Sequence, residues 1–183
     1  RSALADPLAR ARAPSLAGPL PSMPAFTGPA LDGSRLAVVF PASYDAGLAS
    51  AEQYVDAIAA AFDRELDRAS EEKLTLVIDV RGGNGWPNAS PTTLIPFARA
   101  CSNVMGANFP ERVRKVVLYP LPWWATTIWA VVAEFLDART RQKFVLLSGP
   151  AARTEPIPPT ISEHIAEPSV ALIEAARAEL QRA

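Results

Sequence analysis

The chain has 183 residues, of which 49% are hydrophobic and 20% charged, as is typical of one globular domain with a sizeable core. The formal net charge of −1 argues against nucleic acid as a partner and requires any membrane contact to be local and largely apolar. A single cysteine, Cys101, and a single histidine, His164, exclude a disulfide framework and argue against a zinc site, so we expect no metal and no cofactor.

Residues 1–34 are rich in proline, which predicts a linker or a flexible N-terminal segment before a domain at 35–183. Arginines among serine and alanine also give this stretch some likeness to a targeting segment, but the prolines favour a linker. No apolar run reaches the roughly 18 residues that a membrane-spanning helix needs. The lone thiol agrees with a reducing compartment, so we expect a cytoplasmic protein.

The first predicted elements alternate between strand and helix. Leu36–Phe40 is short, apolar and β-branched, which predicts a buried strand. Ser50 and Gln53 have the spacing of a capping box, and apolar residues then recur at helical spacing, which predicts a helix over Ala51–Ala69. Leu74–Val80 is almost continuously apolar, as expected of a central strand covered on both faces.

The same alternation continues to the end of the chain. After a glycine-rich loop, the pattern predicts a helix from Ser90 and Pro91 to Gly106, strands at 113–119 and 144–147, a helix at 123–136, and a last amphipathic helix marked by Val170, Ile173 and Leu180. Alternating strands and helices indicate an α/β fold with a largely parallel sheet and right-handed crossovers.

No catalytic arrangement can be assembled from the sequence. His164 is the only histidine, and it lies in a proline-flanked stretch without a nucleophile motif, so we expect it to be exposed or hydrogen-bonded. The glycines after Val80 lack the lysine and hydroxyl residue of a phosphate-binding loop. Asp79 ends a strand, where a catalytic carboxylate or a turn cap are both expected, but it has no matching partner. We therefore predict no catalytic residues and no enzymatic activity.

The helix predicted at 123–136 is unusual because apolar side chains cover most of its circumference. A surface helix normally has one apolar stripe and one polar face. Two interpretations remain open: a central core helix, or a helix that lines an apolar cavity on one side and presents tryptophans to a membrane on the other.

The stretch from Phe109 to Leu147 resembles the Sec14-like (CRAL-TRIO) family. Its motifs occur in the family's order: Phe-Pro-Glu-Arg, a strand, a Leu-Pro turn, an apolar helix, Phe-Leu-Asp and a strand that begins near Lys143. The resemblance covers roughly residues 35–148. It implies a three-layer α/β fold, with a mostly parallel central sheet and helices packed around it, and an apolar pocket under a gating helix.

The resemblance also implies function and site residues. Members bind and exchange phospholipids or other hydrophobic small molecules at membrane surfaces, which predicts peripheral membrane association. Matching residues predict a headgroup site of Glu111, Thr140 and Lys143, which favours a phosphatidylinositol-type lipid; the alternative is a plain surface ion pair between Glu111 and Lys143. The pocket and gating helix are predicted to comprise Trp123, Trp124, Ile128, Trp129, Val132, Phe135 and Leu136.

Two departures from the family pattern bear on the ligand. The positions of a polar pair used for choline lipids fall on Leu74 and Leu76, with only Thr75 nearby, which argues against phosphatidylcholine. The segment Ile161–Leu180 looks more like the divergent branch of BNIP-2 and Cdc42GAP homology domains. That likeness implies an alternative function, a protein-interaction module that binds small GTPases or forms a homodimer.

Overall fold

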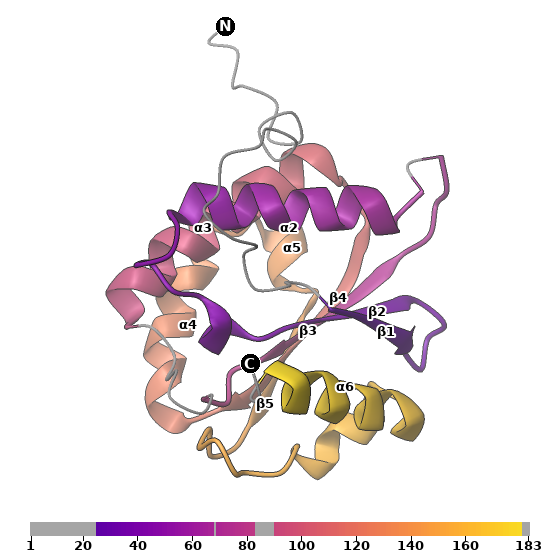
Figure 1. Ribbon diagram of the computed structural model, residues 1–183, viewed down its shortest axis with the longest axis vertical. Coiled ribbons are helices and arrows are strands. Elements are labelled where there is room, and N and C mark those ends of the chain that lie inside the picture. Colours follow the sequence, from indigo (N-terminus) through magenta and orange to yellow (C-terminus); the bar gives the residue numbers. More distant parts are fainter. Residues whose placement is uncertain (1–24, 68, 83–89, 181–183) are drawn as a thin grey trace, which may run out of the picture.

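A computed structural model of the chain describes residues 25–67, 69–82 and 90–180. Its centre is a five-stranded sheet in the order β1-β2-β3-β4-β5 (Figure 1). The strands are β1 (Ala25–Pro29), β2 (Arg35–Val39), β3 (Leu74–Asp79), β4 (Val113–Leu121) and β5 (Phe144–Ser148). β1 is antiparallel to β2, and the remaining pairs are parallel. The predicted α/β class with a mostly parallel sheet is confirmed.

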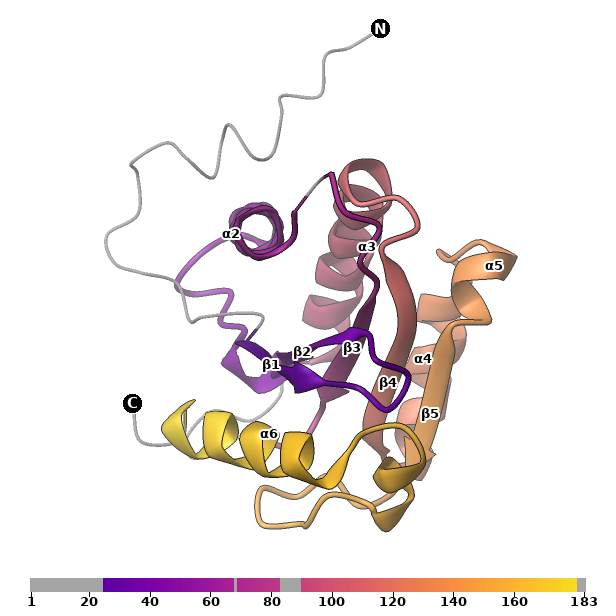
Figure 2. The same cartoon turned by 90° about the vertical axis from the view of Figure 1, so that its right-hand side faces the viewer.

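The helices form layers on both faces of the sheet. They are α2 (Ala51–Glu65), α3 (Pro91–Asn108), α4 (Thr126–Ala133), α5 (Ala138–Arg141) and α6 (Glu167–Leu180). α2, α3 and α4 each lie in a crossover between neighbouring parallel strands. Because the strand order equals the chain order, right-handed crossovers put these three helices on one face. α6 lies on the opposite face (Figure 1 and Figure 2).

The two faces of the sheet bury separate cores, because successive side chains of a strand point to opposite faces. On one face Ala37 and Leu74 pack with Tyr54, Phe62 and other apolar residues of α2 and α3. On the other face, residues of β2 to β5 pack against α6 and the segment before it, and these include Leu36, Val38, Val77, Val117, Ile165 and Ile173. This double burial explains the nearly continuous apolar sequence of β3.

The start of α2 follows the predicted capping box. The Ser50 hydroxyl accepts a hydrogen bond from the Gln53 backbone N–H at 3.3 Å, and the Ser50 N–H donates to Gln53 Oε1 at 2.9 Å. The helix ends at Glu65, four residues before the predicted end, because Leu66 has an extended backbone conformation.

Two segments differ from the sequence prediction. Ala25–Pro29 falls within the predicted linker but forms an edge strand, where proline is tolerated because no neighbour needs its missing N–H. The proposal of a linker is therefore limited to residues 1–24, which lie outside the described part of the chain. The predicted helix at 123–136 is divided into a 3₁₀ turn at Trp123–Ala125 and the shorter α4, and α5 follows with Asp137 as its N-cap.

Within the described residues, no helix combines the length and the apolar character needed to cross a bilayer. Most of the predicted glycine-rich loop, residues 83–89, lies outside the described residues.

Candidate functional site

The central strands are buried unequally on their two faces. On the α6 face Val77, Val117 and Tyr119 are all 0% exposed. On the face of α3 and α4, the register places Ile78, Leu118 and Leu146 side by side, and all three are only half-buried. Apolar side chains in the middle of an inner strand are normally covered. We call Ile78, Leu118, Leu146 and the equally half-buried Phe144 the apolar floor.

α4 stands beside this floor and supplies three of the seven predicted pocket residues, Ile128, Trp129 and Val132. The rings of Trp129 and Phe144 lie 4.6 Å apart between centroids, which fixes α4 against the β5 end of the floor. Ile128, Trp129, Val132 and Phe135 are half-buried, and Leu136 is buried. These side chains lie beside the apolar floor, where the lining of the predicted pocket is expected. The side chain of Trp124 lies outside the described residues.

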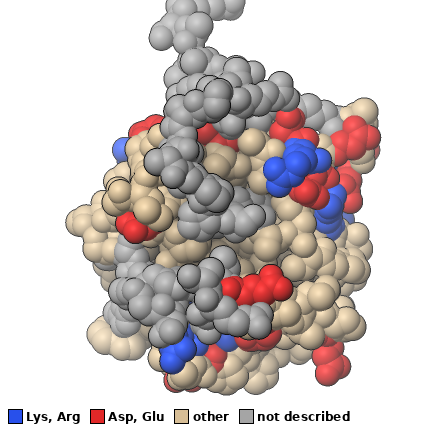
Figure 3. All heavy atoms as spheres, in the orientation of Figure 1, with Lys and Arg blue, Asp and Glu red and all other residues tan. Residues whose placement is uncertain are grey.

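The outer side of α4 and of the turn before it is apolar or uncharged over most of its length. The Trp123 side chain is 85% exposed, and Val131 is 38% exposed. Thr126, Thr127 and Ala130 are also exposed, and Glu134 is the charged residue of this side. An exposed aromatic residue on such a surface is typical of a contact site. On the face of the molecule that Figure 3 shows, charged side chains gather near the C-terminal end of α2.

A charged cluster lies where β4 and β5 begin. Glu111 Oε2 is 3.5 Å from Lys143 Nζ, and Glu111 Oε1 is 3.1 Å from Arg139 Nη1. The structure therefore brings together two of the three predicted headgroup residues and adds Arg139, which the sequence reasoning missed. Lys143 directly precedes Phe144, so the cluster lies beside one end of the apolar floor.

Thr140, the third predicted headgroup residue, is bound within its own helix. Its hydroxyl donates to Asp137 Oδ2 at 2.7 Å, and its backbone N–H donates to Asp137 Oδ1 at 2.9 Å. The hydrogen bond from the Thr140 hydroxyl lowers the pKa of Asp137. Thr140 thus stabilises the first turn of α5.

The backbone at Glu111 has a left-handed conformation, with φ of 59°. Two basic side chains hold this turn. Lys73 Nζ donates to the Glu111 carbonyl at 2.9 Å, and Arg112 Nη1 donates to the carbonyls of Asp67 and Ser70 at 3.0 and 2.8 Å. Non-glycine residues rarely adopt positive φ without such support, and the turn fixes the backbone from which the Glu111 side chain projects.

A buried ionic network lies on the α6 face, at the carboxyl end of β3. Arg81 donates from Nε to Asp79 Oδ1 at 3.0 Å and from Nη2 to Asp79 Oδ2 at 2.6 Å. Its Nη1 donates to the Glu155 carbonyl at 2.8 Å and to Glu174 Oε1 at 2.9 Å. Although burial alone would lower it, the hydrogen bonds and charges of Asp79 and Glu174 raise the pKa of Arg81.

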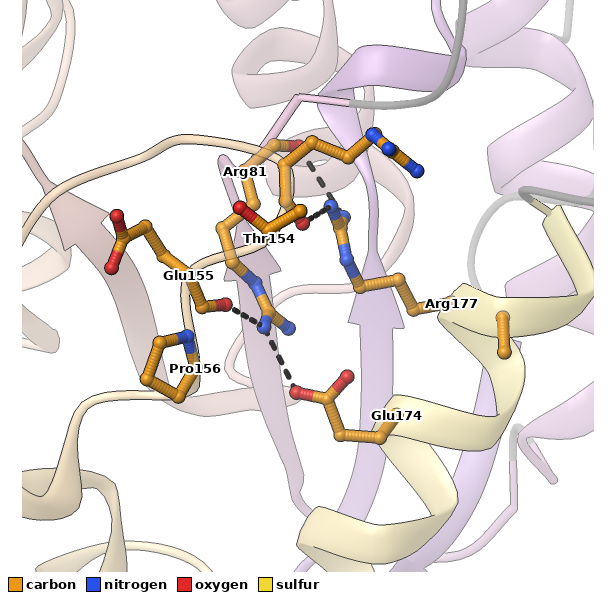
Figure 4. A pocket seen from close by; sticks show the side chains of 8 residues that line it. Arg81, Thr154, Glu155, Pro156, Glu174 and Arg177 are labelled. Atoms are coloured by element: carbon orange, nitrogen blue, oxygen red, sulfur yellow. Dashed lines mark hydrogen bonds and ion pairs between the residues drawn. The ribbon is translucent and has the colours of Figure 1, made fainter.

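A second arginine ties α6 to the same place. The guanidinium of Arg177 donates to the carbonyls of Arg81 and Arg153 (Figure 4) and also to the carbonyl of Gly82. Arg177 Nη1 also lies 3.9 Å from Asp79 Oδ2. Asp79 is thus a structural anion. It accepts a hydrogen bond from the Arg81 backbone N–H, which agrees with the turn-cap interpretation of Asp79 and not with the catalytic one.

A cavity of about 300 Å³ lies beside this network and is lined by Arg81, Arg153, Thr154, Glu155, Pro156, Glu174, Arg177 and Ala178 (Figure 4). Its lining is largely charged, and it lies on the opposite face of the sheet from the apolar floor. It is therefore a different place from the apolar pocket that the sequence predicts. Arg81 and Arg177 are already bound to carboxylates and carbonyls of the protein, so their burial is explained by a structural role without a ligand in this cavity.

Comparison with known proteins adds to this geometry. The family model of the CRAL/TRIO domain matches residues 26–170. The chain belongs to the CRAL/TRIO family, that of the Sec14-like proteins.

Relatives of this CRAL/TRIO chain include the phosphatidylinositol transfer protein PDR17 of Saccharomyces cerevisiae, which is 36% identical over 78 residues. The matched stretch covers 40% of this chain and 21% of PDR17. Among solved structures, the crystal structure of Sfh5 matches this chain with a TM-score of 0.60 at 17% sequence identity. The matched region covers 78% of this chain and 53% of the Sfh5 chain. The chain thus spans only part of either relative, and the likeness to Sfh5 shows the fold alone.

The two positions that the family resemblance relates to choline lipids, Leu74 and Leu76, are apolar in this CRAL/TRIO domain. Leu74 and Leu76 lie on the sheet face that is covered by α2 and α3. Leu74 belongs to the core on that face, and Leu76 packs against it. Thr75 is 0% exposed on the opposite face, and its hydroxyl shares a 2.6 Å hydrogen bond with the Ser34 hydroxyl. Thr75 therefore has no access to a ligand on the floor.

The remaining reactive side chains do not form a site within the described part of the domain. No group of three or more His, Cys, Asp and Glu residues with metal-binding geometry is found among the described residues. Burial raises the pKa of Cys101 to about 12, so its thiol is not a nucleophile at neutral pH. His164 is half-buried, and burial, followed by the charge of Lys115, lowers its pKa.

Proposed function

We propose that this CRAL/TRIO domain binds one lipid or similar hydrophobic molecule on the apolar floor, between α3 and α4, and exchanges it at membranes without catalysing a reaction. The observation that carries the proposal is the unequal burial of the central strands. Ile78 and Leu118 lie on the inner strands β3 and β4 and are half-buried, whereas Val77 and Val117, the residues that precede them and face the other side of the sheet, are 0% exposed. Covering such apolar surface stabilises a bound ligand by about 25 cal/mol per Å².

A phosphatidylinositol-type headgroup is favoured by the charged cluster beside the floor. Lys143 provides a point charge for a phosphate, and the Glu111 carboxylate can accept hydrogen bonds from hydroxyls of a polyol. The relative PDR17 is named as a phosphatidylinositol transfer protein, which supports the same class of ligand. The position of Thr75 on the far face supports the argument against phosphatidylcholine as the preferred lipid.

Exchange at a membrane is favoured by the outer side of α4. Tryptophan prefers the interface between water and lipid, and Trp123 is 85% exposed at the start of this surface. We therefore propose peripheral association of a cytoplasmic protein with a membrane, with α4 as the element that touches the bilayer. The alternative of a module that binds small GTPases or a second copy stays a prediction, which the same experiment tests.

The experiment is native mass spectrometry of the purified chain, with extraction and identification of the bound lipid, before and after incubation with mixed vesicles. A one-to-one lipid adduct supports the proposal. The matched variants are Leu118→Trp, which fills the floor, and Leu172→Trp on α6, where the leucine is 47% exposed.

We expect Leu118→Trp to reduce lipid occupancy about tenfold, which corresponds to about 1.4 kcal/mol, while Leu172→Trp leaves it unchanged. Thermal unfolding of both variants checks that the fold is intact. A parent chain that stays lipid-free after incubation contradicts the proposal and favours the protein-interaction alternative.

A further inference from the structure

The charged cluster of Glu111, Lys143 and Arg139 has a net positive charge only because Arg139 belongs to it. Glu111 and Lys143 alone form a neutral pair, with Glu111 Oε2 3.5 Å from Lys143 Nζ. A phosphodiester that joined only this pair would leave one negative charge without compensation. Arg139 Nη1, 3.1 Å from Glu111 Oε1, supplies a second cation. With it, the three side chains and one phosphodiester sum to zero charge.

Thr140 is poorly placed to provide the missing donor. Its hydroxyl has one hydrogen, and that hydrogen is donated to Asp137 Oδ2 at 2.7 Å. Phosphate oxygens accept hydrogen bonds and do not donate them at neutral pH, so Thr140 can contact a phosphate only after it breaks this bond. Arg139 has five N–H donors in a planar fork that suits two oxygens of one phosphate.

Arg139 is also free to move to a ligand at little cost. Its side chain is 74% exposed and that of Glu111 is 51% exposed, and exposed ion pairs contribute little to stability. Glu111 does not depend on Arg139 for its position, because Lys73 and the left-handed turn hold its backbone. Arg139 can therefore turn to a phosphate while Glu111 stays in place to accept from hydroxyls.

We infer that Arg139 binds the phosphate of the headgroup together with Lys143, and that it makes the site select an anionic polyol phosphate over a zwitterionic choline phosphate. The inference rests on the proposed lipid-binding function and names the residue that sets its headgroup preference. Lys143, with 20% of its side chain exposed, provides the inner charge, and Arg139 provides the outer one.

The test compares lipid uptake by the parent chain, Arg139→Gln and Arg139→Lys from vesicles of phosphatidylcholine with a minor fraction of phosphatidylinositol. The bound lipids are extracted and quantified by mass spectrometry. The control is Arg114→Gln, which removes an equal charge from an exposed arginine whose partner is Asp32 at 2.9 Å. Thermal unfolding confirms the fold of each variant.

We expect Arg139→Gln to lower phosphatidylinositol uptake about threefold to tenfold, the effect of one charge-assisted contact in a solvent-exposed place. Phosphatidylcholine uptake should stay unchanged, Arg139→Lys should lie between parent and Arg139→Gln, and Arg114→Gln should match the parent. Equal phosphatidylinositol uptake by the parent and Arg139→Gln would overturn the inference and leave the proposed lipid-binding function standing.

A second arm separates a lipid headgroup from a free phosphate. Soluble inositol 1-phosphate, which has no acyl chains, is titrated into the parent and into Arg139→Gln by calorimetry. Binding that depends on Arg139, in a parent that takes up no lipid, would support the phosphate chemistry and overturn its lipid source. A parent that binds neither the lipid nor inositol 1-phosphate would overturn both proposals.

Discussion

Substitution of Arg81 by methionine tests whether the buried network holds α6 to the sheet. Asp79 is 0% exposed, and the Arg81 side chain, 2% exposed, donates to both of its oxygens. Removing one partner of a buried pair leaves a desolvated charge and costs about 3 to 5 kcal/mol. We expect about 3 kcal/mol, at the lower end, because Arg177 Nη1 remains 3.9 Å from Asp79 Oδ2.

The contact of Arg81 with Glu174 adds little to this value. The Glu174 side chain is 44% exposed, and pairs with one exposed partner contribute about 0 to 1 kcal/mol. Because a domain of this kind has a total stability of about 5 to 15 kcal/mol, a loss of about 3 kcal/mol is a large share of it.

Urea unfolding followed by circular dichroism measures the effect, with the m-value as a check that only stability has changed. The control is Arg64→Met, which removes an exposed ion pair with Glu65 and should change stability by less than about 0.5 kcal/mol. The double variant Asp79→Asn with Arg81→Met removes both charges, and we expect it to be more stable than Arg81→Met alone. A loss below about 1 kcal/mol for Arg81→Met would refute the assignment of a buried pair that holds the fold.

Three further predictions concern separate parts of the domain. Ser34→Ala leaves the buried Thr75 hydroxyl without its 2.6 Å partner and should cost about 1 to 3 kcal/mol in urea unfolding, and adding Thr75→Val should restore most of the loss. The pKa of His164 is lower in the folded chain than its ordinary value of 6.5, so the unfolded chain binds this proton first as the pH falls. The free energy of unfolding should therefore be unaffected by His164 above pH 6.5 and should decrease below it. His164→Gln should reduce this pH dependence, and an unchanged pH profile of stability in the variant would contradict the prediction. Trp123→Ala should slow lipid transfer between vesicles while thermal stability stays within about 0.5 kcal/mol, because the side chain is 85% exposed; transfer at the parental rate would rule out Trp123 as a membrane contact.

The elements with strong local signals were predictable from the sequence. The capping box of Ser50 and Gln53 marks the start of α2, and the continuous apolar run marks β3 as a strand buried on both faces. β1 escaped prediction because its five residues include a glycine and a proline, and its strand character depends on pairing with β2. The break between the 3₁₀ turn and α4 also lacks a local signal beyond Pro122.

The candidate site was predictable only in part. The chain motif around Glu111 and Lys143 indicated a headgroup site, and the structure brings those two residues together. The same motif included Thr140, whose hydroxyl instead bonds to Asp137 three residues earlier. Arg139 has no distinguishing feature in the sequence, because an arginine in the first turn of a short helix is most often a solvated charge.

The sequence by itself determined the alternation of strands and helices, the mostly parallel sheet and the presence of one unusually apolar helix, because periodicity and capping act between near neighbours in the chain. Only the tertiary structure decided that Arg177 meets Asp79, that Arg139 meets Glu111, and that the floor at Leu118 is open while the face at Val117 is closed. These features depend on which helices cover which face and on contacts between residues distant in sequence. Tertiary packing determines such contacts, and the local sequence pattern does not predict them.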